Sequence, residues 1–185
     1  MPRPWLYPFE LHTRSEIVER YGALPEKVQL EEDAPEGYRW PDLGGVALPE
    51  GYEALLDGVL TRVNIGSPDR PVWDKNESHL LWGTPKRDTG DSFSVWLEDG
   101  KLETVGGMFD LTDLNFAFLQ LVLSLAQRAD QVLVCTHSDE VVEPTPEALA
   151  KSVRSSVPTY WQGDAAERIE QLVVAVRMLQ QPTED

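Results

Sequence analysis

The stretch Ser92-Phe-Ser-Val-Trp-Leu-Glu-Asp-Gly-Lys-Leu-Glu-Thr-Val105 has the pattern of two short strands joined by a tight turn at Asp99-Gly100. An Asp-Gly pair suits a hairpin because both residues tolerate the positive φ that such turns need. Residues 113–126 follow with the sequence Asp-Leu-Asn-Phe-Ala-Phe-Leu-Gln-Leu-Val-Leu-Ser-Leu-Ala, which is apolar in nearly every helical direction. A helix without a polar face must be covered on more than one side. The stretch therefore predicts a hairpin and a buried central helix, capped at Thr112.

The elements expected after this helix mix strands and helices. Residues 131–136 are rich in β-formers and predict a buried strand. Thr145 before Pro146 predicts a helix start, with the end near Ser156 because Pro158 follows. A last helix is expected after Asp164. No strict alternation of strand and helix runs along the chain, so we predict an α+β fold, a small mainly antiparallel sheet packed around the central helix, in a single domain of residues 1–185.

The first ninety residues contain most of the 14 prolines of the chain. Prolines interrupt both helices and sheet ladders, so residues 1–90 are expected to be an irregular, partly helical portion with short elements only. The sequence predicts a helix over 15–21 ended by Gly22, helical spacing within 50–63, and a strand over 79–82. Residues 91–185 are expected to hold the regular part of the domain.

The composition of the chain argues against several classes of function. Of the 185 residues, 41% are hydrophobic, as expected for a globular chain. The chain contains 32 acidic and only 16 basic residues, which gives a net charge of −16. A field of that sign repels nucleic-acid phosphates and anionic membranes. We expect a basic protein partner, unless the charge serves solubility alone. The single Cys135 excludes an intrachain disulfide, and the sequence has neither a secretory signal nor an apolar run that could span a membrane. The expected location is the cytoplasm.

Chemistry-bearing motifs are sparse. Cys135 and His137 stand two residues apart, so on a strand they would share a face and could act as a nucleophile and base in a small hydrolase or transferase. The plainer interpretation is a packed cysteine and an exposed histidine at the strand end. The sequence contains no phosphate-binding glycine motif, metal-ligand spacing or nucleophile elbow. We therefore expect no catalytic residue, metal or cofactor.

The candidate binding residues are acidic side chains that would steer a basic partner and aromatic side chains that would anchor it. Both kinds occur in the irregular portion and around the hairpin. The predicted steering charges are Glu31, Glu32, Asp33, Asp88, Asp91 and Asp99, and the predicted anchors are Trp40 and Trp73.

The layout of residues 92–156 resembles that of bacterial polymorphic-toxin immunity proteins. The shared pattern is a hairpin turning at Asp99-Gly100, a strand closing on 109–111, a buried helix ending at 125–126, a strand at 132–134 and a helix over 146–156. The resemblance implies a small, acidic, cytosolic α+β domain that binds and blocks a cognate toxin, often a basic one. It implies no catalytic residue, since inhibition by binding needs none.

A third hypothesis is a structural or assembly subunit without catalysis. In this case the last helix would pair with its own copy through an apolar face. That face consists of Ile169, Leu172, Val173 and Val176. The sequence leaves the oligomeric state open.

Overall fold

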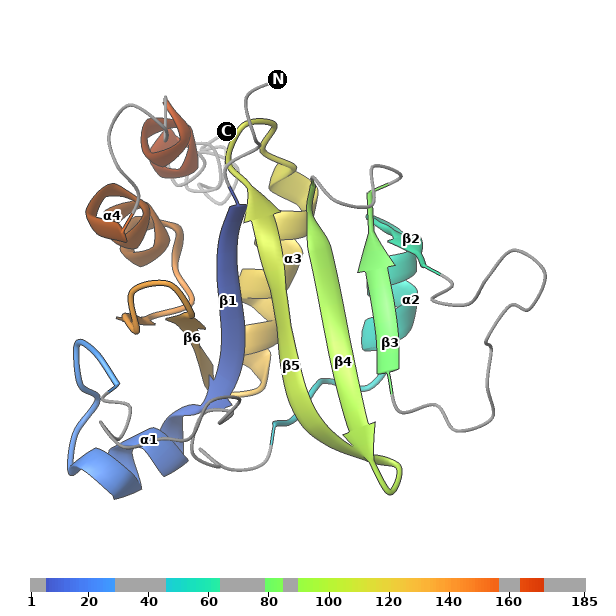
Figure 1. Ribbon diagram of the computed structural model, residues 1–185, viewed down its shortest axis with the longest axis horizontal. Coiled ribbons are helices and arrows are strands. Elements are labelled where there is room, and N and C mark those ends of the chain that lie inside the picture. Colours follow the sequence, from blue (N-terminus) through green and yellow to red (C-terminus); the bar gives the residue numbers. More distant parts are fainter. Residues whose placement is uncertain (1–5, 29–45, 64–78, 85–89, 157–163, 172–185) are drawn as a thin grey trace, which may run out of the picture.

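The computed structural model describes residues 6–28, 46–63, 79–84, 90–156 and 164–171. Their strands form one open, antiparallel, seven-stranded sheet in the order β2-β3-β4-β5-β1-β6-β7 (Figure 1). The strands are β1 (Leu6–Thr13), β2 (Thr61–Arg62), β3 (His79–Gly83), β4 (Ser92–Glu98), β5 (Lys101–Asp110), β6 (Gln131–Cys135) and β7 (Val141–Val142). The helices are α1 (Arg14–Tyr21), α2 (Tyr52–Asp57), α3 (Phe116–Arg128) and α4 (Pro146–Ser156), and residues 165–171 are also helical. The fold class is α+β.

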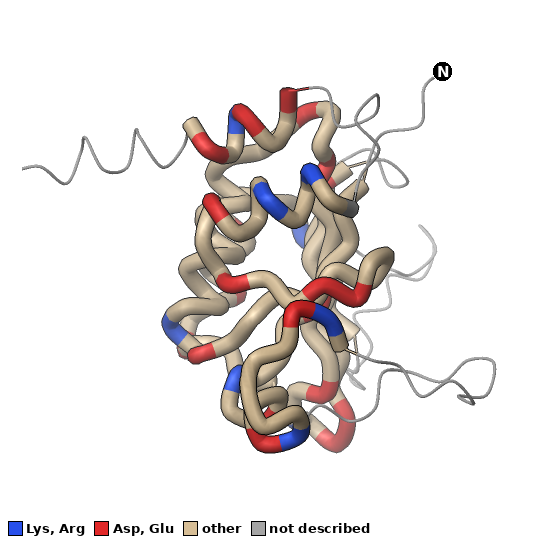
Figure 2. Tube along the Cα trace, turned by 90° about the vertical axis from the view of Figure 1, so that its left-hand side faces the viewer, with Lys and Arg blue, Asp and Glu red and all other residues tan. Residues whose placement is uncertain are grey.

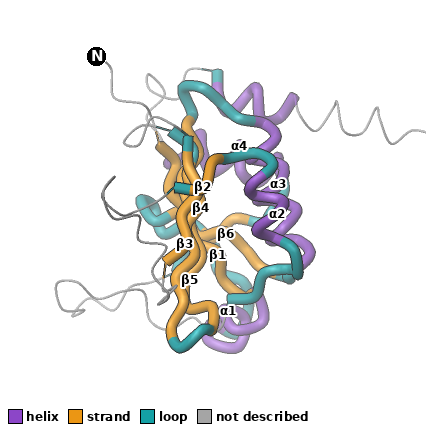
Figure 3. Tube along the Cα trace, turned by 90° about the vertical axis from the view of Figure 1, so that its right-hand side faces the viewer, coloured by secondary structure: helices purple, strands orange, loops and turns teal. Residues whose placement is uncertain are grey.

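The helices α2, α3 and α4 lie together on one side of the sheet (Figure 3). The main core fills the space between that layer and the strands, and α3 contributes six buried side chains to it. A smaller cluster lies on the other face of β6, where Val132 and Val134 pack with Ile17 of α1. All five residues of β6 are therefore buried, which explains why its sequence is an unbroken β-rich run.

The hairpin of β4 and β5 is confirmed, with its turn at Asp99 (φ 51°) and Gly100 (φ 76°). A glycine further along β5 allows the sheet to pack tightly. A Cβ added at Gly107 would lie 2.2 Å from the carbonyl oxygen of Ser92 and 3.0 Å from the Phe9 ring. Gly107 thus permits a close approach of backbones at the centre of the sheet.

The central helix is confirmed, but its predicted start at Thr112 is wrong. The helix begins at Phe116, and the side chain of Asn115 accepts the Phe118 N–H at 3.1 Å as the N-cap. The N–H groups of Thr112 and Asp113 donate instead to the carboxylate of Asp110, which closes a turn before the helix.

The expectation of an irregular start is also wrong, because β1 lies in the middle of the sheet between β5 and β6. Its burial alternates, with Tyr7, Phe9 and Leu11 facing the core. Pro8 is tolerated in this central strand because of the side that its backbone faces. In a strand the nitrogen and the carbonyl of one residue point the same way, and those of Pro8 point toward β6, whose pairing with β1 begins only at Phe9. There the Pro8 C=O accepts the Thr136 N–H at 3.2 Å. The missing donor therefore costs no bond within the β1–β6 ladder.

The other predicted elements differ mostly in length. The strands predicted over 79–82 and 131–136 are confirmed as β3 (79–83) and β6 (131–135). The predicted helix over 146–156 is also confirmed, and Thr145 Oγ1 caps it by accepting the Ala148 N–H at 3.2 Å. The early helix occupies residues 14–21 and ends at Gly22 in the left-handed region, as predicted. The helical segment predicted within 50–63 is shorter, since α2 covers only 52–57 and residues 61–62 form β2.

Candidate functional site

The hairpin tip extends β4 and β5 beyond the ends of β1 and β3 (Figure 1). Its carboxylate residues Glu98, Asp99 and Glu103 are all exposed, beside one exposed cation, Lys101. The tight turn aims these side chains away from the core. Asp99, a predicted steering charge, therefore lies where a partner protein can reach it.

An aromatic pair lies close to the tip, on the sheet face opposite α3. Trp96 stacks on His79 of the neighbouring strand, with ring centroids 3.7 Å apart and an interplanar angle of 7°. Both side chains are half-buried, and burial lowers the pKa of His79 below its ordinary value. Trp96 was not among the predicted anchors. Its position two residues before Glu98 is the signal that could have identified it.

Asp91 is a correction to the predicted steering charges, because its side chain is inside the protein. The residue is 4% exposed, and its Oδ1 accepts the N–H of Asp110 at 2.8 Å. Burial raises the pKa of Asp91 to about 6, and the nearby carboxylates of Asp110 and Asp113 add to the shift. A group in that position cannot contribute a surface charge for steering. The remaining predicted residues lie outside the described residues: Glu31, Glu32, Asp33, Trp40, Trp73 and Asp88.

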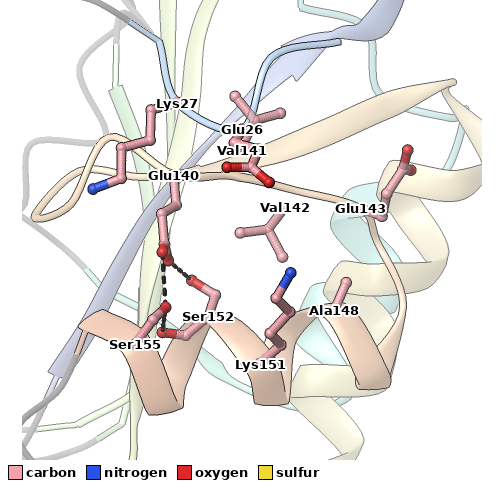
Figure 4. A pocket seen from close by; sticks show the side chains of 10 residues that line it. All are labelled: Glu26, Lys27, Glu140, Val141, Val142, Glu143, Ala148, Lys151, Ser152 and Ser155. Carbon is pink, nitrogen blue, oxygen red and sulfur yellow. Dashed lines mark hydrogen bonds between the residues drawn. The ribbon is translucent and has the colours of Figure 1, made fainter.

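A cleft of about 340 Å³ lies between α4 and β7 (Figure 4). On one side of it, the hydroxyls of Ser152 and Ser155 donate to the two oxygens of the Glu140 carboxylate, at 2.6 and 2.7 Å. Ser152 Oγ also lies 2.7 Å from the hydroxyl oxygen of Tyr7. Because the serine proton is directed at Glu140, the Tyr7 hydroxyl is the donor of that bond. The chain Tyr7–Ser152–Glu140 thus fixes the carboxylate against α4 and β1.

Sequence reasoning missed this network because its members are far apart, with Tyr7 and Ser152 separated by 145 residues. Burial raises the pKa of Tyr7 well above its ordinary value, and neighbouring Cys135 and Glu140 add to the effect. The hydroxyl therefore keeps its proton and remains a donor. The alternation of β1, once recognised, would have placed Tyr7 on the core face, but not beside a serine of α4.

The other charged residues of the cleft are Glu26, Lys27, Glu143 and Lys151. Arg14 donates two hydrogen bonds to the Glu143 carboxylate, one of 2.8 Å to Oε1 and one to Oε2, which lower the pKa of Glu143. Neither lysine has an ion-pair partner within the described part of the chain. Figure 4 shows the Lys151 ammonium extending from α4 toward Val142.

The predicted Cys135–His137 pair does not form on a strand. The strand β6 ends at Cys135, whose side chain is 1% exposed, and His137 is exposed in the following turn. Since the two residues do not share a strand, the expectation of a common face does not apply. Elsewhere in the described ranges, no group of three His, Cys, Asp or Glu side chains is arranged to hold a metal ion.

The apolar face of the last helix, predicted to pair with a second copy of the chain, is partly buried inside the domain. Ile169 is fully buried and belongs to the main core. Leu172, Val173 and Val176 lie outside the described residues.

On the side of the molecule with α1 and α4, acidic residues predominate over basic ones along the described part of the chain (Figure 2). Comparison of the chain with models of known families, with curated proteins and with solved structures gives no match.

Within the ranges that the structure describes, no helix combines the length and apolar character needed to cross a membrane.

Proposed function

We propose that this chain binds a basic protein and inhibits it, as an immunity protein neutralises a cognate toxin by covering its active surface. The observation that carries the proposal is the protruding acidic hairpin tip of a chain with net charge −16. Charges at such a tip reach an approaching partner before the rest of the surface does, and so steer association.

The contact surface in this proposal combines the tip carboxylates of Glu98, Asp99 and Glu103 with the stacked pair of Trp96 and His79. Carboxylates at the rim speed association, whereas a large aromatic side chain near them supplies buried area and slows dissociation. Antiparallel pairing of β3, β4 and β5 places the two groups in one sheet. Inhibition by occlusion requires no catalytic group, which agrees with the burial of Cys135.

The test is affinity capture from cells of the native source with two baits, the unaltered chain and the variant E98K/D99N/E103K, which removes the negative charge of the tip. All three positions are exposed and asparagine accepts the positive φ of residue 99, so the variant is expected to fold. We expect one basic protein to be retained stoichiometrically by the unaltered chain, and to be lost from the variant and at high salt. A matched control makes the same change of charge at three exposed carboxylates away from the tip, in the variant E19K/E147Q/E167K.

The captured protein is then assayed for its own activity with increasing amounts of the chain. Inhibition complete at one equivalent supports the proposal, and the tip variant is expected to inhibit at least tenfold more weakly, with most of the loss in the association rate. Equal capture and equal inhibition by both baits would refute the role of the tip. Capture without inhibition would refute the inhibitory function.

A further inference from the structure

The cleft between α4 and β7 has an unusual balance of charge for so acidic a chain. Arg14 pairs with Glu143 through two hydrogen bonds and, outside the cleft, with Asp130, whose Oδ1 accepts the Arg14 Nε–H at 3.1 Å. The charged groups that remain are the carboxylates of Glu26 and Glu140 and the ammonium groups of Lys27 and Lys151. These four charges sum to zero, although the whole chain carries a net charge of −16.

These opposite charges do not cancel one another by direct pairing. Neither lysine forms an ion pair of 4.0 Å or less within the described residues. Figure 4 shows the Lys27 side chain extending away past Glu140, and the Lys151 ammonium standing on the other side of the serines. Positive and negative groups are thus presented side by side and remain open to a ligand.

The Glu140 carboxylate is held in advance of any binding. Each of its oxygens accepts one serine hydroxyl, at 2.6 Å from Ser152 and 2.7 Å from Ser155. The buried Tyr7 hydroxyl fixes Ser152 in turn. A carboxylate oxygen has two lone pairs, so each oxygen can accept one more hydrogen bond. Since the side chain is already ordered, a ligand that bonds to Glu140 loses less free energy in immobilising it.

We propose that this cleft binds a small zwitterion of the amino-acid type, with its ammonium group on Glu140 and its carboxylate on Lys151. A simple cation would meet the two lysines, and a simple anion would meet two carboxylates and the overall negative field. A ligand that carries both charges a few bonds apart satisfies both groups at once. The volume of about 340 Å³ is at the lower end of the range for small-molecule sites and suits such a ligand.

The site is separate from the hairpin tip, since α4 and β7 lie toward the opposite edge of the sheet from β4. The proposal therefore goes beyond the inhibitory function and does not depend on it.

The test is a titration of the ¹⁵N-labelled full chain, followed by amide chemical shifts. The probes are L-alanine, L-glutamate, and the half-ligands methylammonium and acetate at equal concentrations. We expect L-alanine to shift amides at 140–142 and 151–155 with a dissociation constant below about 1 mM. The half-ligands are expected to bind at least tenfold more weakly, and so is L-glutamate, because its extra negative charge is repelled by a chain of net charge −16.

Two variants test the two ends of the site, and a third serves as the control. Lys151 is exposed, so K151Q is expected to fold, and it should weaken L-alanine binding at least tenfold. E140Q should do the same if it folds, and its folding is checked by the same spectra. The control K101Q removes an exposed lysine at the hairpin tip and should bind as the unaltered chain does. Absence of shifts with L-alanine, unchanged binding to K151Q, or equal binding of methylammonium alone would overturn the proposal.

Discussion

Replacing Asp91 by Asn tests whether a buried carboxylate weakens this fold at neutral pH. The side chain is 4% exposed, and burial raises its pKa from the ordinary 3.8 to about 6. The folded chain therefore holds this proton more tightly than the unfolded chain does. Stability from this group is greatest below pH 3.8, declines as the pH rises through the interval up to about 6, and then stays at its lower value.

The size of the effect follows from the two pKa values of Asp91. At about 1.4 kcal/mol per pH unit, the interval between 3.8 and about 6 corresponds to about 3 kcal/mol at neutral pH. Asparagine has no charge to bury, and its Oδ1 can still accept the Asp110 N–H. Its amide N–H groups need partners of their own, which reduces the gain, so we expect D91N to be about 1–3 kcal/mol more stable at pH 7.5.

The measurement is urea denaturation of both chains at several values between about pH 4 and pH 8. The stability difference between D91N and the unaltered chain should grow with pH up to about 6.5 and then level off. The control is D99N at the exposed turn, where the same substitution removes no buried charge and asparagine accepts the positive φ. A difference for D91N that is independent of pH would refute the argument from burial.

Three further results are expected. G107A should lower the free energy of unfolding by more than about 2 kcal/mol, because the added Cβ would lie 2.2 Å from the backbone oxygen of Ser92; a change below about 0.5 kcal/mol in urea denaturation would contradict this. W82F removes the 2.7 Å bond from the indole Nε1–H to Asp57, the largest cause of that carboxyl's lowered pKa, so NMR titration should find the Asp57 pKa raised; an unchanged value would assign the shift to other groups. Cys135 should react with a thiol reagent only as the chain unfolds, and rapid labelling of the folded chain would revive the hydrolase hypothesis.

The elements that sequence reasoning predicted well are those whose signals are local. The Asp99-Gly100 turn, the apolar run of α3 and the Thr145-Pro146 start of α4 each depend on neighbouring residues. The start of α3 was misplaced because Thr112 and Asn115 are both good caps. Asn115 is the cap because the N–H of Thr112 donates to the Asp110 carboxylate, and this bond holds Thr112 in a turn before the helix.

The strand β1 was missed because Pro8 argues against a central strand. Pro8 is tolerated in β1 because the pairing with β6 begins only beyond it. Where that pairing begins is set by residues 135–136, and cannot be read from residues 1–10. The candidate site was harder still to predict. From the sequence, an aspartate just before a strand is expected to be exposed to solvent, whereas the structure buries Asp91. The hydrogen bond between Tyr7 and Ser152 likewise depends on the packing of α4 against β1.

The central place of β1 has a consequence for how the chain folds. Strand β1 pairs with β5 and β6, so during synthesis its partners are translated only when residues up to 110 and then 135 have been added. Such non-local pairing slows folding, because long loops must close before the contacts form. Without residues 6–13, the sheet would separate into a part made of β2 to β5 and a part made of β6 and β7. Residues 6–13 thus join two parts of the sheet that are translated much later, and the time needed for this pairing can be measured by supplying residues 6–13 as a separate peptide.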